Sequence, residues 1–164
     1  MKRKILSVGA AVLVAVSASA GVGVGAGTAA AISDSSKRGI GGGISLQANA
    51  WECNLWAKAC DWKTSAKVYR GSNRQKMTWV KNVAQITGKG GSVSIGGSGT
   101  GVSGSGSAGS HSFEWTNFNN WTSDLSGQAR SGYLSMVWGI ETCSHASTYH
   151  KRLGVQGTTS ACAG

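Results

Sequence analysis

The sequence CDWKTSAKV at residues 60–68 alternates between two kinds of side chain. Every second residue is apolar or small, and the residues between them are polar or charged. The first set is Cys60, Trp62, Thr64, Ala66 and Val68, and the second is Asp61, Lys63, Ser65 and Lys67. Successive side chains of a β-strand point to opposite faces, so this pattern predicts a strand with one buried face.

Other short segments have the same character. Residues 76–86 are apolar on both sides, which predicts a strand covered on both faces. In residues 112–118, Phe113 and Trp115 share a face. In residues 133–140 the side chains expected to face the core are Leu134, Met136, Trp138 and Ile140. Clusters of glycine, serine and asparagine separate these segments, and the chain has 26 glycines and no proline. The pattern predicts an all-β protein, a small antiparallel β-sandwich or barrel.

Residues 1–31 have the three parts of a secretory signal peptide. The start is positively charged through Lys2, Arg3 and Lys4, residues 5–16 are apolar, and small residues follow. A membrane anchor would need ~20 strongly apolar residues, and this run turns rich in glycine and serine too early. We expect cleavage after Ala31, with Ala20 as the alternative, and a secreted protein. The long, alanine-rich signal resembles those of Gram-positive soil bacteria.

Cleavage at that point leaves a length that suits one domain. We expect residues 32–45 to be a flexible leader and residues 46–164 to be a single β domain. Residues 88–110 are almost pure glycine and serine, which predicts a loop or a hairpin. The serines alternate with Val93, Ile95 and Val102, as in hairpins that insert into membranes. Most of that side is glycine, which argues against insertion.

Four cysteines in an exported protein predict two disulfides. Six residues separate Cys53 from Cys60, so a hairpin turning at residues 56–57, or a wider loop at 55–58, would place the two side by side. Cys143 and Cys162 then pair by elimination. No C-x-x-C pair is present, and we predict neither a metal site nor a cofactor.

The charge balance favours anionic partners. Removing Lys2, Arg3 and Lys4 from the 16 basic residues leaves 13 against six acidic residues, a net charge of +7. Such a charge attracts anionic cell-surface polymers, anionic membranes and nucleic acid, the last on the ground of charge alone. The alternative is that surplus lysines keep the protein soluble.

Seven tryptophans are many for a chain of this size. Trp62, Trp115 and Trp138 share faces with other apolar residues and are expected in the core. Two others stand in polar surroundings: Trp56 at the tip of the expected hairpin, and Trp121 after Asn119 and Asn120. Exposed aromatic rings beside amides can stack on a sugar and bind its hydroxyls, so these four residues, Trp56, Trp121, Asn119 and Asn120, are the candidate binding residues.

No motif predicts a catalytic residue. Glu114, Arg130 and His145 are the residue types that small secreted ribonucleases use, but they form no ordered motif. We therefore expect a secreted, non-enzymatic protein that binds an extracellular anionic or glycan surface. A secreted antibacterial or membrane-active toxin is the alternative, and a small secreted hydrolase is the least supported. The oligomeric state is not indicated.

Overall fold

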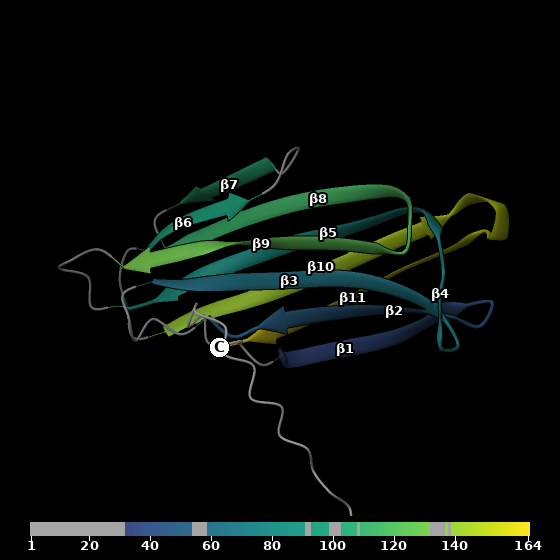
Figure 1. The fold of residues 1–164 in the computed structure, drawn as a ribbon, viewed down its shortest axis with the longest axis horizontal. Helices are drawn as coiled ribbons and strands as arrows, with labels where there is room; N and C mark the ends of the chain where they lie inside the picture. The colour runs from purple at the N-terminus through teal and green to yellow at the C-terminus, as the bar shows by residue number, and fades with distance from the viewer. Residues whose placement is uncertain are drawn as a thin grey trace, which may run out of the picture.

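The computed structural model describes residues 32–53, 59–90, 93–98, 103–107, 109–131, 137 and 139–164. It is an all-β sandwich of two antiparallel sheets, which confirms the predicted fold class (Figure 1). Sheet A has the strand order β1 (Ile32–Gly41), β2 (Ile44–Trp51), β3 (Ala59–Arg70), β9 (Thr122–Ser131) and β6 (Val93–Ser98), and the short β4 (Asn73–Arg74) also pairs with β3. Sheet B has the order β11 (Val155–Ala163), β10 (Gly139–His150), β5 (Met77–Lys89), β8 (Ser110–Asn120) and β7 (Ser103–Ser107). The 3₁₀ turn η1 (Lys151–Leu153) joins β10 to β11.

Strand β3 lies at the centre of sheet A, between β2 and β9, and follows the alternation of its sequence. The buried side chains are Trp62, Thr64, Ala66 and Val68, whereas Asp61 and Lys63 are exposed. Ser65 is the exception, since it is buried on the outer face, where Asn49 Nδ2 donates a hydrogen bond of 2.9 Å to its hydroxyl.

The core consists of two apolar clusters. The first includes Leu46, Val68, Val80 and Ala161, and the second is built around Trp62 and Phe113. Between them lies a layer of three fully buried polar side chains, which we call the polar belt: Thr64 on β3, Asn82 on β5 and Ser144 on β10. Asn82 Nδ2 donates to Thr64 Oγ1 and Ser144 Oγ donates to Asn82 Oδ1, each at 2.9 Å, so the belt joins the two sheets.

The segment expected as a flexible leader is instead a strand, and this corrects the sequence-based boundary. β1 pairs with β2 from Ile32 to Gly41, and Gly42 and Gly43 form the turn with positive φ values that glycine adopts freely. β1 also closes the sandwich against β11. Cys162 N donates to Asp34 Oδ2 at 2.9 Å, and the hydroxyls of Ser36 and Thr159 are 2.9 Å apart. An edge strand at the rim of the sandwich buries few apolar side chains, so the sequence of β1 is polar. That polar sequence is what predicted a flexible leader.

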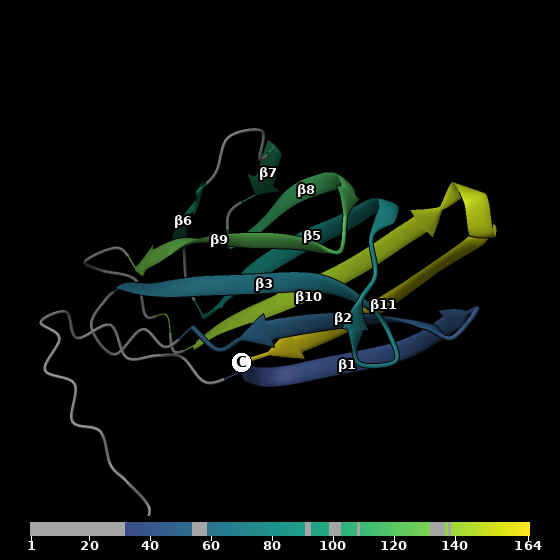
Figure 2. The same ribbon diagram turned by 45° about the vertical axis from the view of Figure 1, so that its right-hand side comes forward.

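The glycine- and serine-rich segment contributes two strands that do not pair with each other. β6 borders sheet A next to β9, and β7 borders sheet B next to β8 (Figures 1 and 2). Phe113 contacts both, because a Cβ added at Gly97 or Gly104 would lie within 2.8 Å of its ring. Glycine is therefore required where the two strands approach this side chain.

Both predicted disulfides are present. Cys143 and Cys162 oppose each other directly on β10 and β11. Cys53 and Cys60, with Cα atoms 5.4 Å apart, lie just beyond the last pair of the β2–β3 ladder, Trp51 with Lys63. The expected turn between these two cysteines, including Trp56, lies outside the described residues.

The other core predictions have mixed outcomes. Ile140 and Phe113 are buried and Trp115 is partly buried, as expected, whereas Leu134, Met136 and Trp138 lie outside the described residues. β5 is buried on one face only, which corrects the expectation of two covered faces. Its outer side chains Trp79 and Val83 are half-exposed. In the described part of the chain no helix is long and apolar enough to span a membrane.

Candidate functional site

The outer face of sheet A collects basic and aromatic side chains from five strands, β1, β2, β3, β4 and β9. Directly opposed residues of antiparallel strands share a face, so the ladder rows define what this surface carries. One row joins Lys37, Gln47, Lys67 and Thr122, and the next joins Ser35, Asn49, Ser65 and Asp124. We call this surface the cationic face; its basic residues are Lys37, Lys63, Lys67, Arg74 and Arg130, and its acidic residues are Asp61 and Asp124.

At one end of the cationic face, four side chains form a cation–aromatic cluster. The guanidinium of Arg74 lies 4.3 Å from the ring centre of Trp121, and Trp121 packs against Tyr69 at 6.0 Å. Lys37 Nζ lies 5.6 Å from the ring centre of Tyr69. These residues come from β1, β3, β4 and the β8–β9 link, so the cluster forms only in the folded sheet.

The β8–β9 link places Trp121 in this cluster. Val68 N donates to the Trp121 carbonyl at 2.8 Å, and Asn120 Oδ1 accepts from Trp121 N at 2.8 Å. Asn119 has a φ of 49°, a left-handed conformation that asparagine tolerates better than most residues, and its side chain is exposed. Of the predicted binding residues, Trp121, Asn119 and Asn120 are thus adjacent here, with the Asn120 side-chain oxygen engaged in the turn.

A second cation–π pair lies further along the same face. Lys63 Nζ is 5.1 Å from the ring centre of Trp51, its cross-strand neighbour on β2. Between this pair and the cation–aromatic cluster, Gln47 Nε2 donates to Ser35 Oγ and to Asn49 Oδ1 at 2.9 and 2.8 Å. The face therefore offers cations, ring faces and a strip of amide and hydroxyl groups.

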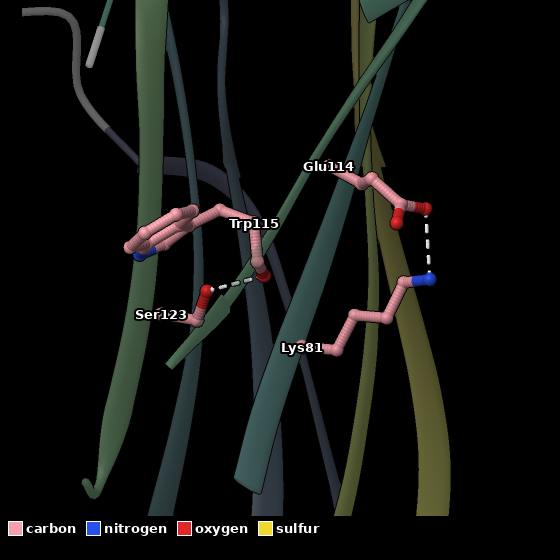
Figure 3. A network of polar contacts seen from close by, with 4 residues as sticks. All are labelled: Lys81, Glu114, Trp115 and Ser123. Carbon is pink, nitrogen blue, oxygen red and sulfur yellow. Dashed lines mark hydrogen bonds and ion pairs between the residues drawn. The ribbon is translucent and has the colours of Figure 1, made fainter. Parts of the chain in front are cut away.

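The basic residues of the cationic face keep their charge available. Among the residues that the structure describes, none of the five forms an ion pair with an acidic side chain. Lys81 on the other sheet behaves differently, since its Nζ lies 2.7 Å from Glu114 Oε2 (Figure 3). Figure 3 also shows that Glu114 and Trp115, neighbours on β8, point to opposite sides of the strand, and that Ser123 Oγ donates to the Trp115 carbonyl at 2.8 Å.

The outer face of sheet B carries a row of aromatic side chains. Tyr149, Trp79 and Phe118 are directly opposed on β10, β5 and β8. The first two rings lie 6.3 Å apart, and Phe118 is 70% exposed. Beside this row is an open groove of about 540 Å³, lined by Arg38, Trp79, Ser147, Thr148, Gln156 and Thr158 among others.

The residue types considered for a hydrolase do not come together. Glu114 and His145 share a row of sheet B but are separated by Val83 on β5, which is about 10 Å for two strand spacings. Arg130 is on sheet A. Glu141 approaches Cys143 and Cys162 closely, but a thiol in a disulfide cannot ligate a metal as a thiolate.

Sequence reasoning missed Trp51, Tyr69 and Lys37 as parts of a surface site. For Tyr69 the sequence carries a usable signal, because Tyr69 lies with Lys63 and Lys67 on the solvent side of the alternating pattern in β3. Their partners on β1 and β2 depend on pairing across the sheet. No protein-family model matches this sequence, and no curated protein matches it as a relative.

Proposed function

We propose that this protein is a secreted, non-enzymatic binding protein that recognises an anionic polymer or anionic glycan surface outside the cell. The observation that carries the proposal is the cationic face, with five basic side chains, two acidic ones, and three of the basic groups held over aromatic rings.

The cation–π contacts matter because they orient a charge without neutralising it. A carboxylate partner would cancel the charge of Lys63 or Arg74 towards a ligand, whereas a ring face leaves most of that field in place. A sheet surface is also rigid and extended, so several contacts to a repeating polymer form without ordering a loop first. The hydroxyl and amide strip at Ser35 and Gln47 supplies hydrogen bonds to a polymer lying across the strands.

A second candidate is a neutral glycan on sheet B. Aromatic rings in a row beside a groove with hydroxyl and amide side chains suit stacking on sugar rings and hydrogen bonding to their hydroxyls. Trp79 and Phe118 would carry such binding, and it would depend little on salt.

Binding to an immobilised sulfated dextran is expected to be strong at about 50 mM salt and at least tenfold weaker at about 200 mM, because each basic contact releases bound counterions. Neutral dextran should bind weakly under both conditions. Calorimetry or surface plasmon resonance measures this. Equal binding to both polymers, unaffected by salt, would exclude the cationic face and favour the aromatic row of sheet B.

The double variant Lys63→Gln with Lys67→Gln should bind sulfated dextran about tenfold more weakly or worse at low salt, with a shallower salt dependence. A matched control removes the same charge elsewhere, at Lys151 and Arg152 in η1. If the control loses as much affinity as the double variant, net charge and not the cationic face governs binding.

Secretion is the second part of the proposal. Two disulfides form and persist in oxidising compartments, which supports an extracellular location. We expect the mature N-terminus within a few residues of Ile32, where β1 begins. N-terminal sequencing of protein from the culture medium measures it. Recovery of a chain that retains Met1 in a membrane fraction would contradict cleavage.

A further inference from the structure

A groove runs along the outer face of sheet B, next to the edge strand β11. Its first part, of about 540 Å³, lies beside Trp79, and its second part, of about 470 Å³, extends to His145. Three lining residues belong to both parts, namely Arg38, Ser147 and Thr158. The two parts therefore adjoin, and we call them together the sheet B groove.

The floor of the sheet B groove is polar, and its polar groups are free to bind a ligand. Ser147 on β10 lies directly opposite Thr158 on β11, and Gln156 lies one row nearer to Trp79. Among the residues that the structure describes, none forms a hydrogen bond with the side chains of Ser147, Gln156 or Thr158. Four residues of β5 separate the rows of Trp79 and Val83, which is about 14 Å at ~3.4 Å per residue. The groove is therefore long enough for a short oligosaccharide.

Arg38 brings a positive charge to the groove from the other sheet. It lies opposite the buried Leu46 in the β1–β2 ladder, so its side chain leaves β1 on the side opposite to Lys37 and the cationic face. β1 runs beside β11 at this rim (Figure 2), where the hydroxyls of Ser36 and Thr159 are 2.9 Å apart. Arg38 therefore remains exposed at the rim and lines the groove along both of its parts.

The charge of Arg38 is not neutralised by the acidic groups around it. Within the described part of the chain Arg38 forms no ion pair, and no acidic residue lines the groove. Both carboxylate oxygens of Asp34, on the same strand, accept backbone N–H groups. Glu114 on β8 is paired with Lys81 at 2.7 Å. The groove therefore favours a ligand with a negative charge.

An acidic sugar matches this combination of groups. Trp79 is half-exposed and offers an aromatic ring to the apolar face of a sugar. The planar guanidinium of Arg38 can bind a carboxylate through two parallel N–H···O bonds. The hydroxyls of Ser147 and Thr158 can donate to and accept from the sugar hydroxyls. A neutral sugar would leave the charge of Arg38 without a partner, and an anion without a ring would leave Trp79 without a contact.

We propose that the sheet B groove binds an oligosaccharide that contains a uronic acid, with a sugar ring stacked on Trp79 and its carboxylate paired with Arg38. This inference rests on the glycan part of the proposed function, and it adds a second site on the sheet opposite to the cationic face. It differs from the neutral glycan considered above, because Arg38 requires an anionic group and Phe118 does not line the groove.

The first test compares two ligands that differ only in charge. The probe is trigalacturonic acid, which is short enough to occupy a single site, and its control is the methyl ester, which keeps the rings and loses the charges. Calorimetry measures both with the full secreted protein at low salt. The acid should bind at least about tenfold more tightly than the ester, because a guanidinium–carboxylate pair is lost in the ester. Equal affinities would overturn the pairing with Arg38, and no binding of the acid would overturn the site.

Two adjacent residues of β1 separate the groove from the cationic face. Arg38→Gln should weaken the binding of trigalacturonic acid about tenfold, and it should leave the binding of the ester and of sulfated dextran unchanged. Lys37→Gln removes the same charge on the opposite side of the strand, so it should leave trigalacturonic acid unchanged and weaken sulfated dextran. An equal loss of trigalacturonic acid in both variants would overturn the groove. If the unmodified protein fails to bind sulfated dextran but binds the trisaccharide through Arg38, the groove is supported and the cationic face is not.

A second measurement locates the ligand on the unmodified protein, without relying on a variant that must fold. In a nuclear magnetic resonance titration with trigalacturonic acid, the backbone amide signals of Ser147 and Thr158 should shift, and those of Lys63 and Lys67 should stay in place. Shifts confined to Lys63 and Lys67 would place the trisaccharide on the cationic face and overturn the groove. Trp79→Ala should weaken the acid and the ester alike, because stacking does not depend on charge. Undiminished binding of both ligands would contradict the stacking on Trp79.

Discussion

Replacing Trp62 with alanine is expected to lower the free energy of unfolding by about 3–5 kcal/mol, since it removes the largest fully buried side chain among the residues that the structure describes. The indole of Trp62 on β3 stacks against Phe113 on β8, with ring centres 5.2 Å apart and an interplanar angle of 24°. It therefore joins the two sheets in the second cluster. Denaturant unfolding followed by circular dichroism measures the loss.

The variant Trp62→Phe separates packing from hydrogen bonding at the same position. It keeps an aromatic ring against Phe113 but loses the bond from Trp62 Nε1 to the Gly96 carbonyl. A smaller loss of about 1–2 kcal/mol is expected. If Trp62→Ala costs less than about 1 kcal/mol, Trp62 does not occupy the core position described.

Replacing Asn82 with alanine is expected to cost about 2–4 kcal/mol, because it removes two buried hydrogen bonds and leaves the Thr64 hydroxyl without its partner in the belt. Asn82 is fully buried and bonds Thr64 Oγ1 through its amide nitrogen and Ser144 Oγ through its amide oxygen. Thr64 would keep no partner in the belt, and Ser144 would keep only the Ser65 carbonyl at 3.3 Å. The same denaturant titration measures this loss.

The control for Asn82 removes the whole polar belt. The variant Thr64→Val, Asn82→Leu and Ser144→Ala leaves no stranded hydroxyl and keeps the volume similar, so it should lie within about 1 kcal/mol of the unmodified protein. A triple variant as unstable as Asn82→Ala would show that packing around Asn82, and not hydrogen bonding, sets the cost.

Local alternation predicted β3, β5 and β8, which carry much of the core, but not β2, β9 or most of β10. The pattern around Trp62 and Phe113 placed each of these side chains on a buried face, and cysteine spacing with elimination predicted both disulfides. Two features were out of reach. β1 has a polar sequence because it lies at an edge of sheet A, where it pairs with β2 and contacts the rim of β11. No local sequence pattern reports these contacts. The glycine strands β6 and β7 have too few side chains to indicate which sheet each would join.

The candidate site was predictable only in part, for a related reason. Trp121 stood out because polar residues surround it in the sequence. Its partners Tyr69 and Arg74 are brought to it by the two-residue strand β4, which is too short to leave a periodic signal. Lys37 joins the cluster from β1. Sites assembled across a sheet depend on strand order, and strand order follows from contacts distant in the sequence.

The polar belt also has a consequence for cooperativity. Apolar contacts couple neighbouring layers of a core strongly, and the belt interrupts them between the two clusters. The belt itself is held across the two sheets by the hydrogen bonds of Asn82. We therefore expect local opening of β6, whose Val93 packs in the second cluster, to require less free energy than global unfolding.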